Sequence, residues 1–238
     1  MRTLFQWSFL LFFLVGTWSC EVMSAEKSPN LSVINQLMEG NRRYQESNPI
    51  HPDQTKFRRE SIAEKQNPKA IIISCSDSRV PPEIIFDQGL GDFFVIRTAG
   101  NVIGDLELAS IEYALLKLNC NTIMVLGHEK CGAIQSFLDF PVDTLPGHLN
   151  ELVNFIRCQP VQQKLIKTPG DKNYESVLNN VIYVVSLMKE KSQIIQKKFE
   201  DEELEIFGAI YHLDNGKVQI IEDEIRKKSQ LTELKPNK

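Results

Sequence analysis

Two short segments of this chain carry the side-chain types that bind zinc in enzymes. The first is Cys75-Ser76-Asp77-Ser78-Arg79, where a thiol, a carboxylate and a guanidinium occupy alternate positions, and the second is His128-Glu129-Lys130-Cys131. Zinc binds cysteine sulfur and histidine nitrogen, and catalytic sites use three protein ligands and keep a fourth position for water. Cys75, His128 and Cys131 supply that number of ligands, which predicts a catalytic zinc site.

The elements that precede these segments must bring them together. Ala70–Ile73 lies before Cys75 and Thr122–Leu126 lies before His128, and both are apolar runs typical of strands buried on both faces. In a parallel sheet the carboxyl ends of such strands share one edge, where α/β folds place their ligand sites. We therefore expect the two segments to meet at one edge of a parallel sheet.

Asp77 and Arg79 are expected to act beside the metal. An arginine can hold a carboxylate through two parallel hydrogen bonds, and Asp77 held in this way would accept a hydrogen bond from a metal-bound water. A freed Asp77 could instead bind the metal and close the site. Because zinc lowers the pKa of bound water and two thiolates weaken that effect, activity should rise with pH above neutrality.

The remaining pattern predicts one α/β domain with a mostly parallel central sheet flanked by helices. A hairpin signal at Asp214-Asn215-Gly216-Lys217 adds an antiparallel strand at the C-terminal edge. Residues 139–168 show a weak pattern, apart from an apolar face at Leu149, Leu152, Val153 and Ile156. Strands are predicted over Phe93–Arg97, Leu204–Leu213 and Val218–Ile221, and helices over residues 30–46 with an interruption at Gly40-Asn41, over Glu83–Phe86, after Asp105 as the N-cap, over Ala133–Leu138 and over Val177–Phe199.

The N-terminus has the pattern of a secretory signal peptide. Met1-Arg2 is basic, and Phe9–Val15 is uninterrupted apolar sequence followed by small or polar residues. That run is shorter than the ~20 residues that span a bilayer. We expect residues 1–24 to be cleaved, which would place the protein in a bacterial periplasm without a membrane span in the mature chain.

The sequence also predicts the boundaries of the mature domain and offers an alternative form of membrane attachment. Residues 25–222 are expected to form the zinc domain, and residues 223–238 a charged tail. Lipid attachment at Cys20 is the weaker alternative, because Thr17-Trp18-Ser19 resembles a lipoprotein signal poorly.

Composition and cysteine usage narrow the possible partners. The net charge is -4 with 42% hydrophobic residues, and no basic stripe is interleaved with aromatic residues, so no nucleic-acid partner is expected. In an oxidising compartment the cysteines after the leader could form disulfides. We expect instead that Cys75 and Cys131 are metal thiolates and that Cys120 and Cys158 are core thiols.

The two segments resemble the zinc-binding motifs of the β-class carbonic anhydrases. The likeness extends from about Leu31 to Ile221, and further segments follow in the order of that family: Gly40-Asn41-Arg42-Arg43-Tyr44, Arg97-Thr98-Ala99-Gly100-Asn101, Ile111-Glu112-Tyr113-Ala114 and Gly208-Ala209-Ile210-Tyr211. The resemblance implies a zinc-dependent carbonate dehydratase, which hydrates carbon dioxide reversibly to bicarbonate and a proton through attack of zinc-bound hydroxide.

The same resemblance assigns roles to individual residues. It implies one Zn²⁺ per chain on Cys75, His128 and Cys131, with Asp77 and Arg79 as the catalytic pair. It also implies a substrate pocket formed by Gln66, Phe94, Tyr113 and Gly132, where the aromatic positions are often supplied across a dimer interface. A homodimer or a tetramer is therefore expected.

Rival readings remain. Asp77 could close the zinc site and leave a structural or inactive protein, and carbonyl sulfide or carbon disulfide could replace carbon dioxide as substrate. A phosphatase loop is disfavoured because Cys75 and Arg79 are too close in sequence. A zinc deaminase is disfavoured because Glu129 directly follows His128, whereas that signature separates its histidine and glutamate by one residue.

Overall fold

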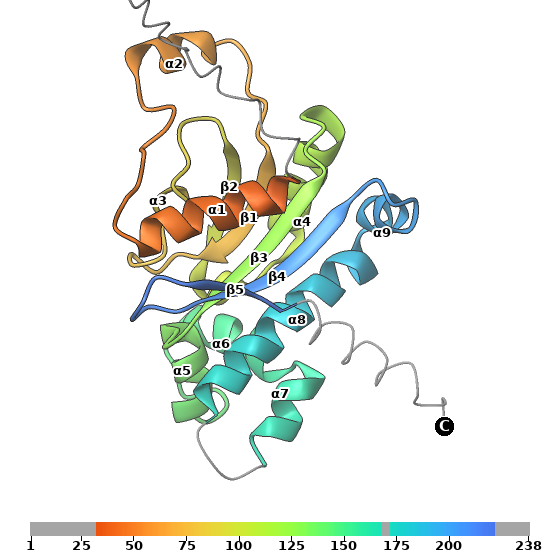
Figure 1. Cartoon of the computed structure of the whole chain (residues 1–238). Helices are drawn as coiled ribbons and strands as arrows, with labels where there is room; N and C mark the ends of the chain where they lie inside the picture. The colour runs from red at the N-terminus through yellow and green to blue at the C-terminus, as the bar shows by residue number, and fades with distance from the viewer. Residues whose placement is uncertain (1–31, 168–171, 222–238) are drawn as a thin grey trace, which may run out of the picture. The chain divides into compact units, whose positions relative to one another are not determined.

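The computed structural model describes residues 32–167 and 172–221 and contains one five-stranded sheet within them (Figure 1). The strand order is β2-β1-β3-β4-β5, and the first four strands are mutually parallel while β5 runs antiparallel to β4. This confirms the predicted α/β class and its antiparallel edge. The strands are β1 (Ala70–Cys75), β2 (Phe93–Thr98), β3 (Thr122–His128), β4 (Glu205–Tyr211) and β5 (Val218–Ile220).

Helices cover both faces of the sheet and form two apolar cores with it (Figure 1). One core takes buried side chains from α4, α5, α6, α8 and α9, and the other takes them from α1 and α3. The helices are α1 (Val33–Gln45), α2 (Lys56–Ser61), α3 (Pro82–Ile85), α4 (Asp105–Lys117), α5 (Gly132–Asp139), α6 (Leu149–Arg157), α7 (Pro160–Leu165), α8 (Asn173–Lys191) and α9 (Gln193–Glu200), with a 3₁₀ turn, η1 (Ala99–Asn101), after β2.

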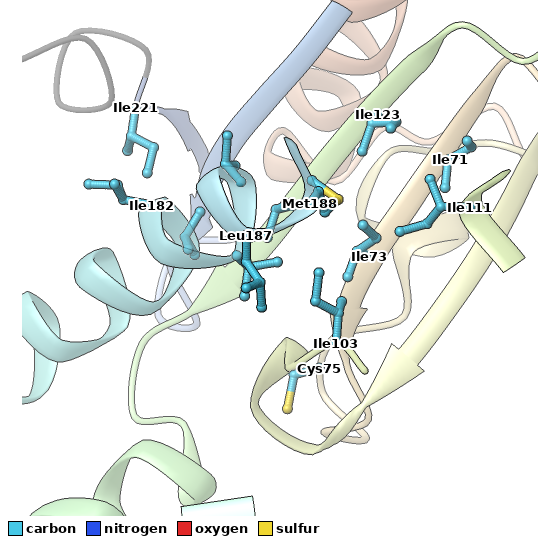
Figure 2. Close-up of a cluster of buried hydrophobic side chains, with 14 of the residues drawn as sticks. Ile71, Ile73, Cys75, Ile103, Ile111, Ile123, Ile182, Leu187, Met188 and Ile221 are labelled. Carbon is cyan, nitrogen blue, oxygen red and sulfur yellow. The ribbon is translucent and has the colours of Figure 1, made fainter. Parts of the chain in front are cut away.

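Strand β1 is buried along its whole length. Ile71, Ile73 and Cys75 belong to the core under α8, and Figure 2 shows them following one another along the strand. Ala70 and Ile72 belong to the opposite core. This alternation is the period of two of a strand between two helical layers, and it places the Cys75 thiol at the end of an apolar row.

The carboxyl ends of β1 and β3 lie side by side at the point where the strand order reverses. The chain passes from β1 outward to β2, and then returns across β1 to β3 on its other side. In doubly wound sheets this switch point opens the crevice where ligands bind. Cys75 ends β1 and His128 ends β3. The strand order therefore brings the segments that begin at Cys75 and His128 to the same edge of the sheet, as predicted.

Helix α1 is continuous through Gly40-Asn41, so the predicted interruption is wrong. A Cβ at residue 40 would lie 1.8 Å from the Phe86 carbonyl oxygen, which means that glycine permits α1 to approach the chain at the end of α3. The Asn41 amide donates to the carbonyls of Ile85 and Gly216, and its oxygen accepts from the Val218 amide. Gly40 and Asn41 therefore connect α1 to the end of α3, and Asn41 also connects it to the start of β5.

Three other predictions about helices need correction. Gly104, rather than Asp105, is the N-cap of α4, and its amide donates to Glu107 at 2.8 Å. The helix predicted over Val177–Phe199 is two helices, because the Ser192 hydroxyl accepts from the Ile195 amide and starts α9. The weakly patterned residues 139–168 contain α6 and α7.

The predicted leader and tail, residues 1–24 and 223–238, lie outside the described residues. Within residues 32–167 and 172–221, no helix combines the length and apolar character that a membrane crossing requires.

Candidate metal centre

The three predicted ligands converge at the carboxyl edge of the sheet. The Sγ atoms of Cys75 and Cys131 are 4.0 Å apart, and these atoms and a His128 ring nitrogen all lie within 4.8 Å of one another. Two sulfurs bound to one tetrahedral zinc at about 2.3 Å would lie about 3.8 Å apart. All three residues are buried, so the cluster is shielded by the strand ends and the start of α5.

His128 leaves one ring nitrogen ready to bind a metal. Its Nδ1 donates to the Glu129 carbonyl at 2.8 Å, and the carbonyl can only accept, so the proton lies on Nδ1. Nε2 is fully buried and has no hydrogen-bond partner within the described part of the chain. A buried imidazole nitrogen without a partner is costly, whereas metal ligation would satisfy it. Histidine ligands to metals commonly show this arrangement.

Cys75 is placed where its sulfur is stable as a thiolate. The Asp77 and Gly100 amides donate to Cys75 Sγ at 3.4 and 3.2 Å. Hydrogen bonding, first from the Cys131 thiol and then from these amides, outweighs burial and lowers the pKa of Cys75 below its ordinary value. The same pairing with Cys75, and then burial, raises the pKa of the Cys131 thiol. Two adjacent thiolates repel each other, and a divalent cation between them would allow both to ionise.

Asp77 is held by Arg79 in the predicted two-pronged geometry. Arg79 Nε donates to Oδ1 at 2.9 Å and Nη2 donates to Oδ2 at 2.8 Å, and the Arg79 backbone amide donates to Oδ1 as well. The Arg79 hydrogen bonds hold the pKa of Asp77 well below its ordinary value. Oδ2 lies 3.9 Å from His128 Nε2, so the ionised carboxylate is beside the metal ligands while its oxygens bind the guanidinium.

Arg97 and Gly100 support the centre, although neither was assigned a role from the sequence. Arg97 donates to the backbone carbonyls of Cys75 and Asp77, at 3.0 and 2.6 Å, and so fixes the loop that carries the ligand and the acid. Gly100 has φ +66° and would place a Cβ 2.9 Å from Ala133 Cβ. The glycine-bearing segment that ends β2, at the same sheet edge, was the available signal.

The residues expected to form the substrate pocket lie in two places. Gly132 opens α5 beside Cys131, and no atom lies within 4 Å of the position its Cβ would take. Phe94 pairs with Ile71, four residues before Cys75, which is roughly 13 Å along the strand. Tyr113 lies against Phe94, with ring centroids 6.2 Å apart. Exposed Gln66 precedes the start of β1, so one chain does not bring these three side chains to its own ligands.

The remaining cysteines of the described residues divide into a buried one and an exposed one, and both are free. Cys120 is buried as expected, and burial raises its pKa to about 11. Cys158 is exposed at the end of α6, so its assignment as a core thiol is wrong.

Known proteins resemble this chain over most of its length. The family model described as carbonic anhydrase matches residues 70–218. Carbonic anhydrase 2 of Mycobacterium tuberculosis is 39% identical over 191 residues, which cover 79% of this chain and 91% of that protein.

Solved structures show the same fold. The β-carbonic anhydrase CcaA aligns with a TM-score of 0.64 at 26% identity, and the alignment covers 81% of this chain and 96% of that chain. One of the chains described as tetrameric β-carbonic anhydrases from Sordaria macrospora aligns with a TM-score of 0.60 over 79% of this chain and 93% of its own. At 23% identity the latter is a likeness of fold.

Proposed function

Because the chain belongs to the β-class carbonic anhydrase family, we propose that Cys75, His128 and Cys131 hold one zinc ion for catalysis. As a carbonic anhydrase, the protein interconverts carbon dioxide and bicarbonate with release or uptake of a proton. The observation that carries the zinc assignment is the buried, unpartnered Nε2 of His128 beside two sulfurs spaced for one tetrahedral ion.

The donor set fits zinc in particular. Two thiolates and one imidazole suit zinc, whereas calcium and magnesium prefer oxygen ligands. Zinc bound in this set would act as a Lewis acid that lowers the pKa of a water ligand. The two thiolate charges reduce this effect, so the proposal includes a rise of activity with pH above neutrality.

Asp77 and Arg79 supply the acid–base geometry in this proposal. Asp77 stays ionised at neutral pH and accepts a hydrogen bond from the attacking water, which orients the water towards the substrate. Arg79 occupies both carboxylate oxygens and restrains Asp77 from binding the metal. This bidentate pair favours an open site over the rival in which Asp77 closes it.

The exposed surface beside strand β2 supports pairing with a second copy of this chain. Strand β2 is an edge of the sheet. Beside it, the outer side of α4 exposes Leu106 by 80%, Leu116 by 56% and Tyr113 by 49%. Large apolar side chains of this kind mark an interaction surface. Pairing along this surface would cover them and bring Phe94 and Tyr113 towards the metal centre of the other copy. The fold neighbours described as tetramers support an oligomer.

Export of the protein is the remaining part of the proposal. The basic start, the apolar run Phe9–Val15 and the small or polar residues after it support cleavage near residue 24 and a periplasmic location. Mass measurement of the mature protein isolated from the periplasmic fraction checks this. A mass that includes residues 1–24 would contradict cleavage.

Stopped-flow hydration of carbon dioxide, together with metal analysis of the same preparation, tests the function. We expect about one zinc per chain and a rate that rises with pH to a plateau. Zinc without activity from pH 6.5 to 9 would indicate the closed, structural site. Activity without metal would contradict the proposed centre.

A further inference from the structure

A row of buried amides leads from the centre of the helical layer to the Cys75 sulfur. Gln159, just before α7, donates through Nε2 to Asn180 Oδ1 at 2.7 Å, and Asn180 on α8 donates through Nδ2 to the Gly100 carbonyl at 2.8 Å. Gly100 in turn donates its amide to Cys75 Sγ at 3.2 Å. Gln159 is fully buried and Asn180 is 1% exposed.

Burial makes these hydrogen bonds specific. An unpaired amide in this interior would lose its hydration without compensation, so Asn180 is constrained to the partners it has. Asn180 binds the η1 turn at Gly100, whose backbone lies in the left-handed region with φ +66° and ψ +22°. The amide and the carbonyl of Gly100 belong to successive peptide units that are joined at its Cα, so holding the carbonyl restricts the directions that the amide can take without fixing them by itself.

We propose that Asn180 is a positioning residue for the metal centre: by holding the Gly100 carbonyl it restrains the η1 turn in the conformation in which the Gly100 amide donates to the Cys75 sulfur. Gln159 supports this role by fixing the orientation of the Asn180 amide. The inference rests on the proposed zinc coordination by Cys75. Partners that orient metal ligands through hydrogen bonds typically change metal affinity by about 10–100-fold when they are removed.

A matched control lies on the same two helices. Gln162 on α7 is also fully buried, and its Nε2 donates to the Ser176 carbonyl of α8 at 2.7 Å. Within the described residues Gln162 makes no hydrogen bond to η1, so Gln162→Leu removes a comparable buried amide without changing the contact to Gly100. Asn180→Leu and Gln162→Leu should therefore lose similar free energies of unfolding and differ at the metal.

The test measures zinc release from the purified zinc-loaded enzyme into a colorimetric chelator, 4-(2-pyridylazo)resorcinol. Asn180→Leu should release zinc about 10–100-fold faster than the wild type, Gln159→Leu several-fold faster, and Gln162→Leu at the wild-type rate. In cobalt-substituted protein, the sulfur-to-cobalt absorption band of Asn180→Leu should move to longer wavelength, because a thiolate with a weakened hydrogen bond is a better electron donor.

Equal zinc release from Asn180→Leu and Gln162→Leu, with an unshifted cobalt band, would overturn the inference while leaving the proposed function in place. If Asn180→Leu does not fold, Gln159→Leu decides, and a wild-type release rate in that variant overturns the inference. A wild-type protein that binds no zinc through Cys75 would overturn the proposed function and this inference with it.

Discussion

Asp77 combines two requirements that conflict in most environments. In the proposed centre it must remain ionised beside the two cysteine sulfurs, and it must not bind the metal that they would hold. The Arg79 guanidinium meets both requirements, because it lowers the pKa of Asp77 and occupies both carboxylate oxygens. The roles of these two residues can be separated by substitution.

Replacing Asp77 by asparagine should keep the zinc and remove most of the activity. The amide is almost the same shape, but it is neutral and a weaker acceptor for the water proton. We expect the hydration rate to fall by about 10²–10⁴-fold, with zinc content unchanged by metal analysis. Asp139→Asn, on an exposed carboxylate at the end of α5, is the control and should retain the wild-type rate. Full activity in Asp77→Asn would remove Asp77 from the mechanism.

Arg79→Lys should also lower the hydration rate, but by less than Asp77→Asn does. A lysine keeps the positive charge but cannot form the two parallel bonds to a carboxylate, so Asp77 would be free to approach the metal for part of the time. We expect the stopped-flow rate to fall about tenfold while Asp77 remains ionised, with the zinc still bound. A rate equal to that of the wild type would show that charge alone is sufficient at this position.

At the scale of elements, the buried carboxylate of Asp87 joins helix α1 to the chain after α3. Asp87 accepts from Arg43 Nε at 2.6 Å and from the Ile50 and His51 amides at 3.0 and 2.9 Å. Burial alone would raise the pKa of Asp87, but the Ile50 amide, Arg43 and the His51 amide together hold it below its ordinary value of 3.8. The charged form is therefore the one that stabilises the fold.

Asp87→Asn should destabilise the protein in a pH-dependent way. The folded-state pKa is lowered, so the contribution is complete above pH 3.8 and is lost as the pH falls through the lower folded value. At pH 7 we expect Asp87→Asn to lower the free energy of unfolding by on the order of 3 kcal/mol. Below pH 3.8 the difference between the variant and the wild type should become smaller. Urea unfolding of both proteins at pH 7 and at a pH below 3.8 measures this change. Glu60→Gln, in an exposed pair with Lys56, should change stability by less than about 0.5 kcal/mol. A difference for Asp87→Asn that does not depend on pH would contradict the assignment.

The elements that periodicity could predict are those whose burial is uniform. Residues 70–73 and 123–126 are apolar without interruption, and both form fully buried strands whose ends carry the predicted ligands. Residues that act through contacts distant in sequence were less accessible. Gly40 and Asn41 resemble a helix break until α3 and β5 are packed against them. Ser192 divides one apolar pattern into two helices through a single hydroxyl.

Within the candidate site, too, some features can be read from local sequence and others depend on distant contacts. The ligands and the Asp77–Arg79 pair are visible as side-chain types at short spacing. The amide of Gly100 acts through the backbone, and its partner Asn180 lies 80 residues further along the chain. No local pattern marks either role, because both depend on how α8 packs against the η1 turn.

At the scale of the whole molecule, the exposed apolar side chains of α4 form the surface that we propose as the interface between two copies of the chain. Leu106→Glu places a charge on its most exposed leucine, and a two-fold interface would bring in that charge twice. We expect the dimer dissociation constant to rise by about 10²-fold, measured by light scattering over a concentration series. Hydration activity should fall with the fraction of dimer, while zinc remains bound.

The matched control for this prediction is Leu149→Glu. Leu149 is also an exposed leucine on a helix, 51% exposed at the start of α6. We expect its oligomeric state to equal that of the wild type. Dissociation by both variants, or by neither, would contradict an interface on α4.

X-ray absorption at the zinc edge of the purified, active enzyme tests the central claim most directly. Coordination by Cys75, His128 and Cys131 predicts two sulfur neighbours at about 2.3 Å, with one nitrogen and one further light atom at about 2.0–2.1 Å. A shell with no sulfur, or with a single sulfur, in a preparation that hydrates carbon dioxide would contradict this centre.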